Sequence, residues 1–200
     1  MLPRTVRISD IVEETRTIKT FVLDDEIDAQ PGQFVMLWLP GVDEKPISIA
    51  APDPLTLTVA RVGPFSNALH ECQVNDRLSW RGPFGRPFRL EPTRPALLVG
   101  GGYGAAPLYF LAVQAAAHGI ATTVALGARR ADDLLFVERF QRLGVQLLLA
   151  TEDGSAGLKG FVTEESRRDW RTGQRCMPAG RKGCSSHFTR CATNMDCRGN

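Results

Sequence analysis

The stretch Leu97-Leu98-Val99-Gly100-Gly101-Gly102-Tyr103-Gly104-Ala105-Ala106-Pro107-Leu108 decides how this chain is organised. An apolar run over 96–99 enters it, a glycine-rich turn follows, and the apolar run from Leu108 is typical of a helix. Such a strand–turn–helix unit offers unpaired N–H groups and partial positive charge to a phosphate. The spacing Gly-x-Gly-x-Gly-x-x-Pro therefore favours a nucleotide site. The alternative is a tight connection that binds nothing.

Downstream of this stretch, strand and helix patterns alternate. Strands are predicted over 96–99, 122–126 and 145–150, and helices over 106–118 and 131–143, each helix ended by a glycine. This alternation predicts a parallel sheet with helices packed on it, a truncated Rossmann-like α/β domain over 96–163. The third strand runs into Thr151–Ser155, and loops after strand ends are where such folds bind ligands.

Residues 1–92 have a different pattern, with short strands separated by turn residues. Such spacing predicts an antiparallel barrel of Greek-key type or a sandwich. The run 33–39 is almost continuously apolar, so it is expected to be buried on both faces. A short helix is expected over 66–72, and the segment 93–96 is the predicted domain boundary. The expected strands cover 5–8, 16–23, 33–39, 45–50, 55–61 and 77–81.

Composition narrows the class of protein. The chain has 200 residues and a formal net charge of +2, so charge gives no strong case for nucleic acid or an anionic membrane as partner. No apolar run is long enough to span a bilayer, and the N-terminus lacks the apolar segment of a signal peptide. A cytoplasmic location is the expectation.

Several motifs together resemble the ferredoxin reductase-like flavoproteins. Residues 45–49 (Lys-Pro-Ile-Ser-Ile) resemble that family's Arg-x-x-Ser/Thr flavin motif, and 59–66 (Val-Ala-Arg-Val-Gly-Pro-Phe-Ser) its next flavin-contacting segment. Residues 81–88 resemble the turn that closes the barrel. The segment 151–162 is similar to one subfamily, the electron-transfer subunit of dihydroorotate dehydrogenase with its hydrogenase and sulfite-reductase relatives. The resemblance covers residues 1 to about 163.

The resemblance implies an FAD site on the barrel. Lys45 stands where the family has Arg, which keeps the charge but loses the planar fork. Ser48 is implied to hydrogen-bond the isoalloxazine. Taken singly, these polar residues could equally be ordinary residues at strand ends. The implied FAD-binding residues are Lys45, Pro46, Ile47, Ser48, Ala60, Arg61, Val62, Phe65 and Ser66.

An NAD(P) site is implied on the α/β domain. No acidic residue ends the second strand, where a ribose-binding carboxylate often lies. Arg129 and Arg130 lie there instead; they could favour a 2′-phosphate or form a solvated turn, and the subfamily generally uses NADH. The implied NAD(P)-binding residues are Gly100, Gly101, Gly102, Gly104, Ala105, Pro107, Arg129 and Asp153. No residue is assigned a catalytic or metal-binding role.

The function implied by the family is electron transfer. NAD(P)H would give hydride to FAD, and electrons would pass to a catalytic dihydroorotate dehydrogenase-like subunit of pyrimidine biosynthesis in a hetero-oligomer. The alternatives are a self-sufficient NAD(P)H–flavin reductase, a hydrogenase or sulfite-reductase subunit, or a non-catalytic flavin-binding remnant. Whether this chain is itself active is left open by its sequence.

The segment 164–200 differs from the rest of the chain. It carries eight Lys/Arg against four Asp/Glu, and its lack of periodicity predicts neither the next strand nor the next helix. Four of the five cysteines lie here, at 176, 184, 191 and 197. Their gaps are wider than those of plant-type [2Fe–2S] or zinc sites. The [2Fe–2S] cluster expected in the intact parent protein therefore lacks its ligands.

One hypothesis explains this segment as translation out of frame. Back-translation of 175–200 and reading one base upstream permits Val-His-Ala-Cys-Gly-Pro-Glu-Gly-Met, the family's missing motif, followed by a helix-like run. The shift would lie between Glu164 and Gly173. The alternative is a genuine variable or disordered C-terminus. Under the first reading, the chain lacks the strand that completes the nucleotide sheet.

Overall fold

The structure, a computed structural model, describes residues 2–163 and the backbone of 175–179. The chain divides into two compact units, Met1–Pro87 (unit 1) and Phe88–Asn200 (unit 2). The division falls a few residues before the boundary that the sequence predicts at 93–96. The sequence analysis expects segments 164–174 and 180–200 to be poorly ordered, and these segments lie outside the described residues.

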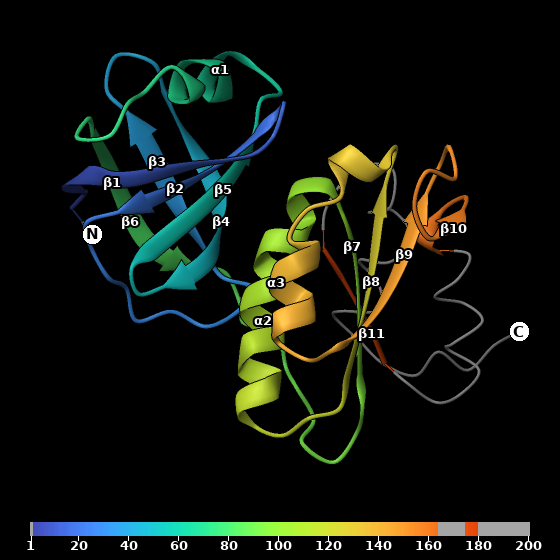
Figure 1. Cartoon of the computed structure of the whole chain (residues 1–200). Helices are drawn as coiled ribbons and strands as arrows, with labels where there is room; N and C mark the ends of the chain where they lie inside the picture. Colours follow the sequence, from blue (N-terminus) through green and yellow to red (C-terminus); the bar gives the residue numbers. More distant parts are fainter. Residues whose placement is uncertain (1, 164–174, 180–200) are drawn as a thin grey trace, which may run out of the picture. The chain divides into compact units, whose positions relative to one another are not determined.

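Unit 1 is a closed antiparallel barrel in the order β1-β2-β5-β4-β3-β6, and α1 lies across one of its ends (Figure 1). The predicted barrel is confirmed; β1, β4 and β6 extend beyond their expected limits, and the other three strands are one or two residues shorter than expected. The elements are β1 Arg4–Thr15, β2 Ile18–Leu23, β3 Phe34–Leu39, β4 Asp43–Pro52, β5 Leu55–Ala60, α1 Pro64–His70 and β6 Arg77–Phe84.

Alternation along the strands fills the barrel with branched and aromatic side chains. In β5, for example, Leu55 and Leu57 are fully buried while Thr56 between them is not. Burial of each such side chain contributes roughly 1.5–3 kcal/mol. The side chains with no exposure in unit 1 are Ile8, Phe21, Leu23, Val35, Leu37, Ile49, Leu55, Leu57, Leu69 and Leu78.

Strand β3 corrects one expectation. Its apolar run predicts burial on both faces, but only Val35 and Leu37 are buried, and Trp38 is 40% exposed. A barrel strand has one inner and one outer face, so alternate side chains must point outward. On the outer face, Phe34 packs against Phe84 of β6, with ring centroids 5.9 Å apart. An unbroken apolar run can therefore belong to a half-buried strand.

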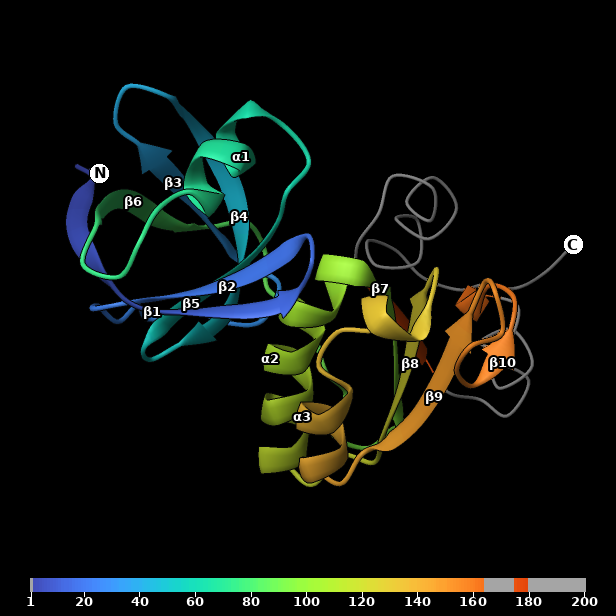
Figure 2. The same cartoon turned by 45° about the horizontal axis from the view of Figure 1, so that its top comes forward.

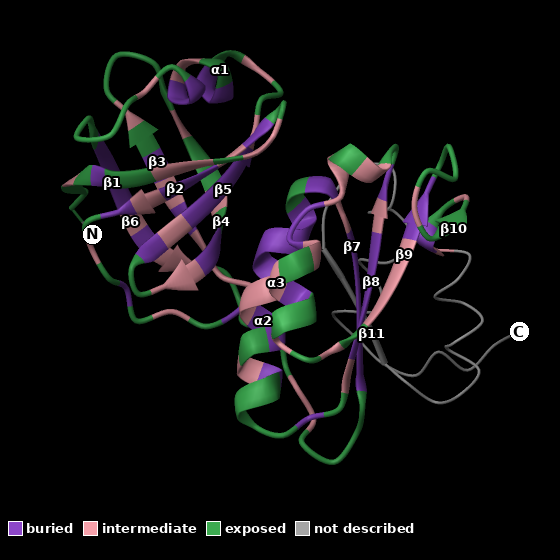
Figure 3. Cartoon of the chain, viewed as in Figure 1, coloured by how far each residue is buried: buried purple, intermediate pink, exposed green. Residues whose placement is uncertain are grey.

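Unit 2 is a parallel sheet in the order β10-β9-β8-β7-β11, with α2 and α3 side by side on one face (Figures 1 and 2). The Rossmann-like prediction is confirmed. Figure 3 shows β7 and β8 buried along most of their length. The elements are β7 Ala96–Gly101, α2 Ala105–Ala117, β8 Thr122–Ala128, α3 Val137–Arg142, β9 Gln146–Thr151, β10 Leu158–Lys159 and β11 Arg175–Ala179, with 3₁₀ turns over Gly102–Gly104 and Ala131–Asp133.

The predicted helix over 131–143 is divided. A 3₁₀ turn covers Ala131–Asp133, and α3 begins only at Val137 because Phe136 before it has a left-handed backbone, with φ of 61°. The Phe136 side chain is buried and its ring contacts Tyr109 of α2 at 5.8 Å between centroids. Packing of this ring thus overrides the helical pattern.

The expectation that no strand follows residue 163 is wrong at the level of the backbone. Strand β11 pairs in parallel with β7, from Arg175 opposite Ala96 to Ala179 opposite Gly100. The outer edge of β7 presents backbone donors and acceptors, and these can pair with a strand of almost any sequence. The periodicity of side chains in the sequence therefore does not predict a strand that pairs in this way.

No helix in the described part of the chain is long and apolar enough to cross a membrane.

Candidate functional site

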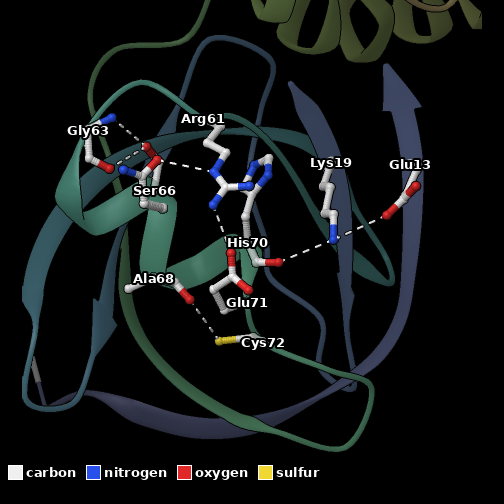
Figure 4. Close-up of polar contacts among 10 residues, drawn as sticks. Glu13, Lys19, Arg61, Gly63, Ser66, Ala68, His70, Glu71 and Cys72 are labelled. Carbon is white, nitrogen blue, oxygen red and sulfur yellow. Dashed lines mark hydrogen bonds and ion pairs between the residues drawn. The ribbon is translucent and has the colours of Figure 1, made fainter. Parts of the chain in front are cut away.

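The turn before α1 is closed by the Ser66 hydroxyl. Its Oγ accepts hydrogen bonds from the amides of Val62 (2.9 Å) and Gly63 (3.0 Å) and donates to the Gly63 carbonyl at 3.1 Å (Figure 4). Ser66 is buried, with 6% exposure, and no longer offers a free hydroxyl. By helix geometry, the first-turn amides of Phe65 and Ser66 have no intrahelical acceptor.

Arg61 lies immediately before this turn and is held by α1. Its Nε donates to Asn67 Oδ1 at 3.3 Å, and its Nη2 pairs with Glu71 Oε1 at 2.8 Å. Its backbone amide donates to the Thr17 carbonyl at 2.7 Å, which anchors the chain where β5 ends. The middle of α1 and the residue directly after its end therefore orient the Arg61 guanidinium.

The first motif residues lie on β4. Antiparallel pairing of β4 with β5, with Ile49 opposite Leu57, brings the start of β4 and the end of β5 to the same edge of the barrel. Both predicted flavin segments therefore meet there. Lys45 and Ser48 are exposed, as is Pro46, and Ile47 is half-buried.

Lys45 forms an ion pair with Asp43 on the same strand. A hydrogen bond from Lys45, followed by one from the Glu44 backbone, lowers the pKa of the Asp43 carboxyl. Both side chains are about half exposed, at 49% each, so the pair is well solvated and easily exchanged. The Lys45 ammonium can therefore turn to another anion at little cost.

The glycine-rich loop of unit 2 is formed by close backbone approach. A Cβ on Gly101 would lie 2.9 Å from the Gly127 carbonyl oxygen on neighbouring β8, and Gly102 has a left-handed φ of 56°. The loop leads into the N-terminus of α2, a helix of 13 residues with no side-chain cap. Gly100, Gly104, Ala105 and Pro107 are buried in this connection, and Pro107 falls in the first turn, where no N–H is needed. A glycine-rich turn that leads into a helix N-terminus is the kind of backbone that favours an anion.

Arg129 and Asp153 lie together at the carboxyl ends of β8 and β9. The Asp153 amide donates to the Arg129 carbonyl at 3.3 Å. The Asp153 carboxylate accepts from the Ser155 amide (2.9 Å) and hydroxyl (2.6 Å), and the hydroxyl contact is the main reason why the pKa of Asp153 is lowered. The Asp153 carboxylate is thus hydrogen-bonded within its own loop, while the Arg129 side chain is exposed.

The sequence analysis did not identify three residues that lie at the candidate sites. Asn67 and Glu71 are four residues apart, the spacing of side chains on one face of a helix, and this signal becomes useful only once α1 is known to start at Pro64. Tyr103, inside the glycine loop, is 38% exposed. The sequence could have indicated this exposure, because Tyr103 lies between two glycines, which have no side chains to cover its ring.

A metal centre finds no support in residues 2–163, which contain no group of three or more His, Cys, Asp or Glu side chains placed to hold an ion. The cysteines at 176, 184, 191 and 197 lie outside the side chains that the structure describes. Cys72 in unit 1 is half-buried, and burial raises the pKa of its thiol.

Comparison with known proteins finds relatives that share one description. A Thermococcus kodakarensis protein, described as the probable electron transfer subunit of dihydroorotate dehydrogenase B (NAD(+)), is 39% identical over 178 residues, covering 88% of this chain and 75% of the relative. The chain belongs to this family. A relative of the same description from Methanocaldococcus jannaschii is 45% identical over 166 residues, 82% of this chain.

The match to these relatives covers only part of their length. The chain spans 63% of the length of its Methanocaldococcus jannaschii and Methanothermobacter thermautotrophicus relatives. No model of a protein family matches the sequence.

Solved structures agree on the fold. An NADH-dependent reduced ferredoxin–NADP oxidoreductase, studied for flavin-based electron bifurcation, is 30% identical with a TM-score of 0.79, covering 88% of this chain and 67% of that one. The ferredoxin reductase of carbazole 1,9a-dioxygenase has a TM-score of 0.80 at 21% identity, covering 95% and 65%, and shows the fold alone.

Proposed function

We propose that this chain is a flavoprotein electron-transfer subunit, which takes electrons from NAD(P)H through FAD and passes them to a catalytic dihydroorotate dehydrogenase subunit in pyrimidine biosynthesis. The observation that carries the proposal is family membership at 39% identity over 75% of a relative of that description. The two units support it, because each presents its own candidate nucleotide site. The proposed domains are 1–92 for FAD and 96–163 for NAD(P)H.

The residues of unit 1 fit FAD. A flavin dinucleotide needs positive charge for its diphosphate, hydrogen-bond donors, and an apolar surface for its ring. The edge formed by the start of β4 and the end of β5 offers Lys45 and Arg61 as cations, and the first-turn amides of α1 as donors. Val62, 79% exposed, and Ile47 offer apolar surface. Ser48, exposed on β4, is the proposed hydrogen-bond donor to the ring.

Ser66 has a different proposed part. Because its hydroxyl is engaged with the amides of Val62 and Gly63, it shapes the turn rather than binding through Oγ. Phe65 is buried with 4% exposure and holds α1 against the barrel, leaving its amide for the ligand. Ala60 and Pro46 are assigned to the surface beside the ring.

The residues of unit 2 fit a dinucleotide. The loop over Gly100–Gly104 and the start of α2 would take the diphosphate, because backbone N–H groups and the helix dipole favour an anion there. Arg129 and Asp153, at the ends of neighbouring parallel strands, are assigned to the ribose side. NADH is the proposed donor, as the relatives' description names NAD(+).

When bound, FAD supplies the redox chemistry: it accepts hydride and releases electrons singly or in pairs. The protein binds, orients and shields the two nucleotides. A [2Fe–2S] cluster is proposed for the parent protein only, since the described residues hold no ligand set for it. We place the protein in the cytoplasm, in a hetero-oligomer with its catalytic subunit.

The first experiment is reconstitution of the purified 200-residue chain with FAD. We expect the chain to stay yellow after gel filtration, and its flavin absorbance to bleach when NADH is added anaerobically. Changing Lys45 and Ser48 together to alanine should weaken FAD binding by about thirtyfold or more, as the loss of one charge-assisted and one neutral hydrogen bond implies. A wild-type chain that stays colourless would contradict the proposal.

A second acceptor class follows from one comparison. The NADH-dependent reduced ferredoxin–NADP oxidoreductase matches 88% of this chain at 30% identity. A ferredoxin-type protein is therefore an alternative acceptor. Reduction of ferredoxin by the reconstituted chain and NADH, without any catalytic subunit, would favour it. Dependence of turnover on a dihydroorotate dehydrogenase catalytic subunit would favour the first.

A further inference from the structure

Arg61 is held by two side chains, one from α1 and one from the residue directly after that helix. Asn67 accepts from its Nε and Glu71 from its Nη2, at 3.3 and 2.8 Å. Figure 4 shows the guanidinium linked to Glu71 beside the turn that Ser66 closes. The two acceptors lie four residues apart, which places them on the same face of a helix. Together they define one orientation of the guanidinium plane.

The contacts use only part of the guanidinium. It carries five N–H donors, and these two contacts occupy the edge formed by Nε and Nη2. The Nη1 atom makes no hydrogen bond with the described residues, and Nη2 keeps a second hydrogen. The end-on edge, Nη1 with Nη2, is therefore available as a two-pronged donor, the geometry that suits a phosphate.

We propose that Asn67 and Glu71 are positioning residues, which hold Arg61 so that its free edge binds the phosphates of the flavin nucleotide. The proposal rests on the FAD site proposed above and names the residues that pre-organise it. A flexible arginine loses side-chain freedom when it binds, and holding it beforehand reduces that loss.

The ion pair itself has little structural value. The Arg61 and Glu71 side chains are 48% and 72% exposed, and exposed pairs of this kind stabilise a fold weakly. Glu71 also brings negative charge close to a site for an anion, which by charge alone opposes phosphate binding. Orientation and charge therefore predict opposite signs for the effect of neutralising Glu71, and this difference makes the proposal testable.

The experiment measures dissociation constants of the full chain for FAD and for riboflavin by flavin fluorescence. The variants are Glu71→Gln, Asn67→Ala and Arg61→Ala, with Glu13→Gln as the matched control. Glu13 pairs with Lys19 at 3.3 Å on the same barrel and is 76% exposed, so its change also removes one negative charge from a surface ion pair. Thermal unfolding of each variant checks the fold.

The expected result is FAD binding about threefold to tenfold weaker in Glu71→Gln and Asn67→Ala, with riboflavin binding unchanged because it has no phosphate. Glu13→Gln should bind FAD as the wild type does. In the Arg61→Ala background, the change at Glu71 should no longer weaken FAD binding, since there is no guanidinium left to orient and only the loss of a negative charge remains.

Two outcomes overturn the proposal, and they are distinguishable. FAD binding that is unchanged or tighter in Glu71→Gln, with a wild type that binds FAD, refutes the positioning role and leaves the FAD site intact. Equal weakening of FAD and riboflavin refutes it too, because the loss would not involve phosphate. A wild type that binds neither would overturn the proposed function as a whole.

Discussion

The buried residue His70 makes the stability of unit 1 depend on pH. Its ring is 6% exposed, its Nε2 lies 2.9 Å from the Val59 carbonyl, and it packs against Phe21 with centroids 6.0 Å apart. Burial is the main cause that lowers the pKa of His70 below its ordinary value of 6.5, against the opposing hydrogen bond to Val59. The folded state therefore favours the neutral ring, which donates from Nε2.

The sign of the pH effect follows. Because the folded pKa lies below the unfolded one, the unfolded state binds the proton first as pH falls. Stability from His70 is complete above pH 6.5 and is lost as pH drops through 6.5 towards the folded pKa. We expect the free energy of unfolding to fall less steeply between pH 7 and 5 in His70→Gln.

The control for this prediction is His118→Gln, which removes an exposed histidine at the end of α2. Urea unfolding at a series of pH values measures both variants. Parallel pH profiles for wild type and His70→Gln would show that the buried ring does not titrate on unfolding.

Gly101 gives the second residue-scale prediction. Its backbone is extended, so conformation does not demand glycine, but a Cβ there would lie 2.9 Å from the Gly127 carbonyl oxygen. Gly101→Ala should therefore destabilise unit 2 by about 1–3 kcal/mol, because two paired strands must separate slightly. Gly63→Ala is the control, since its φ of −176° is extended and no atom lies within 4 Å of its added Cβ. Equal melting temperatures would contradict the close approach.

At the scale of elements, Asp25 ties together the strands that close the barrel. The carboxylate, with only 7% side-chain exposure, pairs with Arg4 of β1 and accepts from Trp80 Nε1 of β6 at 3.2 Å. Arg4 and Trp80 are also directly opposite each other in the β1–β6 ladder. A single carboxylate after β2 therefore supports the pairing of two other strands.

Removing this carboxylate should loosen the closure. Asp25→Ala would leave the Trp80 N–H and the Arg4 guanidinium without their acceptor, and we expect a loss of about 2–4 kcal/mol in the free energy of unfolding. Asp10→Ala is a suitable control, because the Asp10 carboxylate accepts a hydrogen bond from the amide of its own neighbour, Ile11. Denaturant unfolding followed by tryptophan fluorescence measures both, and similar midpoints would argue against this role.

At the scale of the whole molecule, the two compact units should respond separately to ligands. A ligand stabilises the part that binds it by RT ln(1 + [L]/Kd), which is about 2.7 kcal/mol at a hundredfold excess over Kd. We therefore expect saturating FAD to raise the melting transition of unit 1 and leave that of unit 2 in place. Differential scanning calorimetry with and without FAD tests this, and a joint shift of one transition would show that the units unfold together.

The segment 164–200 carries the last prediction. Under the out-of-frame hypothesis, the coding DNA read one base upstream of 175–200 encodes Cys-Gly-Pro-Glu-Gly-Met and continues into clustered cysteines. Sequencing the gene across these codons measures it directly. Stop codons soon after the start of that frame would make the segment genuine, and its four cysteines would then need a role of their own.

The sequence by itself determined the two-part organisation, the glycine loop and the family. These features depend on local periodicity and on backbone needs, such as the glycines over 100–104, that a short segment expresses alone. The family motifs at 45–48 and 59–66 were legible for the same reason, and antiparallel pairing of β4 with β5 then brought them to one edge.

Only the tertiary structure decided which groups meet. Ser66, predicted as a ligand contact, turns its hydroxyl to the amides of Val62 and Gly63, and Arg61 finds Asn67 and Glu71. Strand β11 pairs with the backbone of β7, and Trp38 faces outward because a barrel strand has two faces. The sequence pattern indicates which positions are apolar, whereas their burial and their partners depend on which elements the fold places beside them.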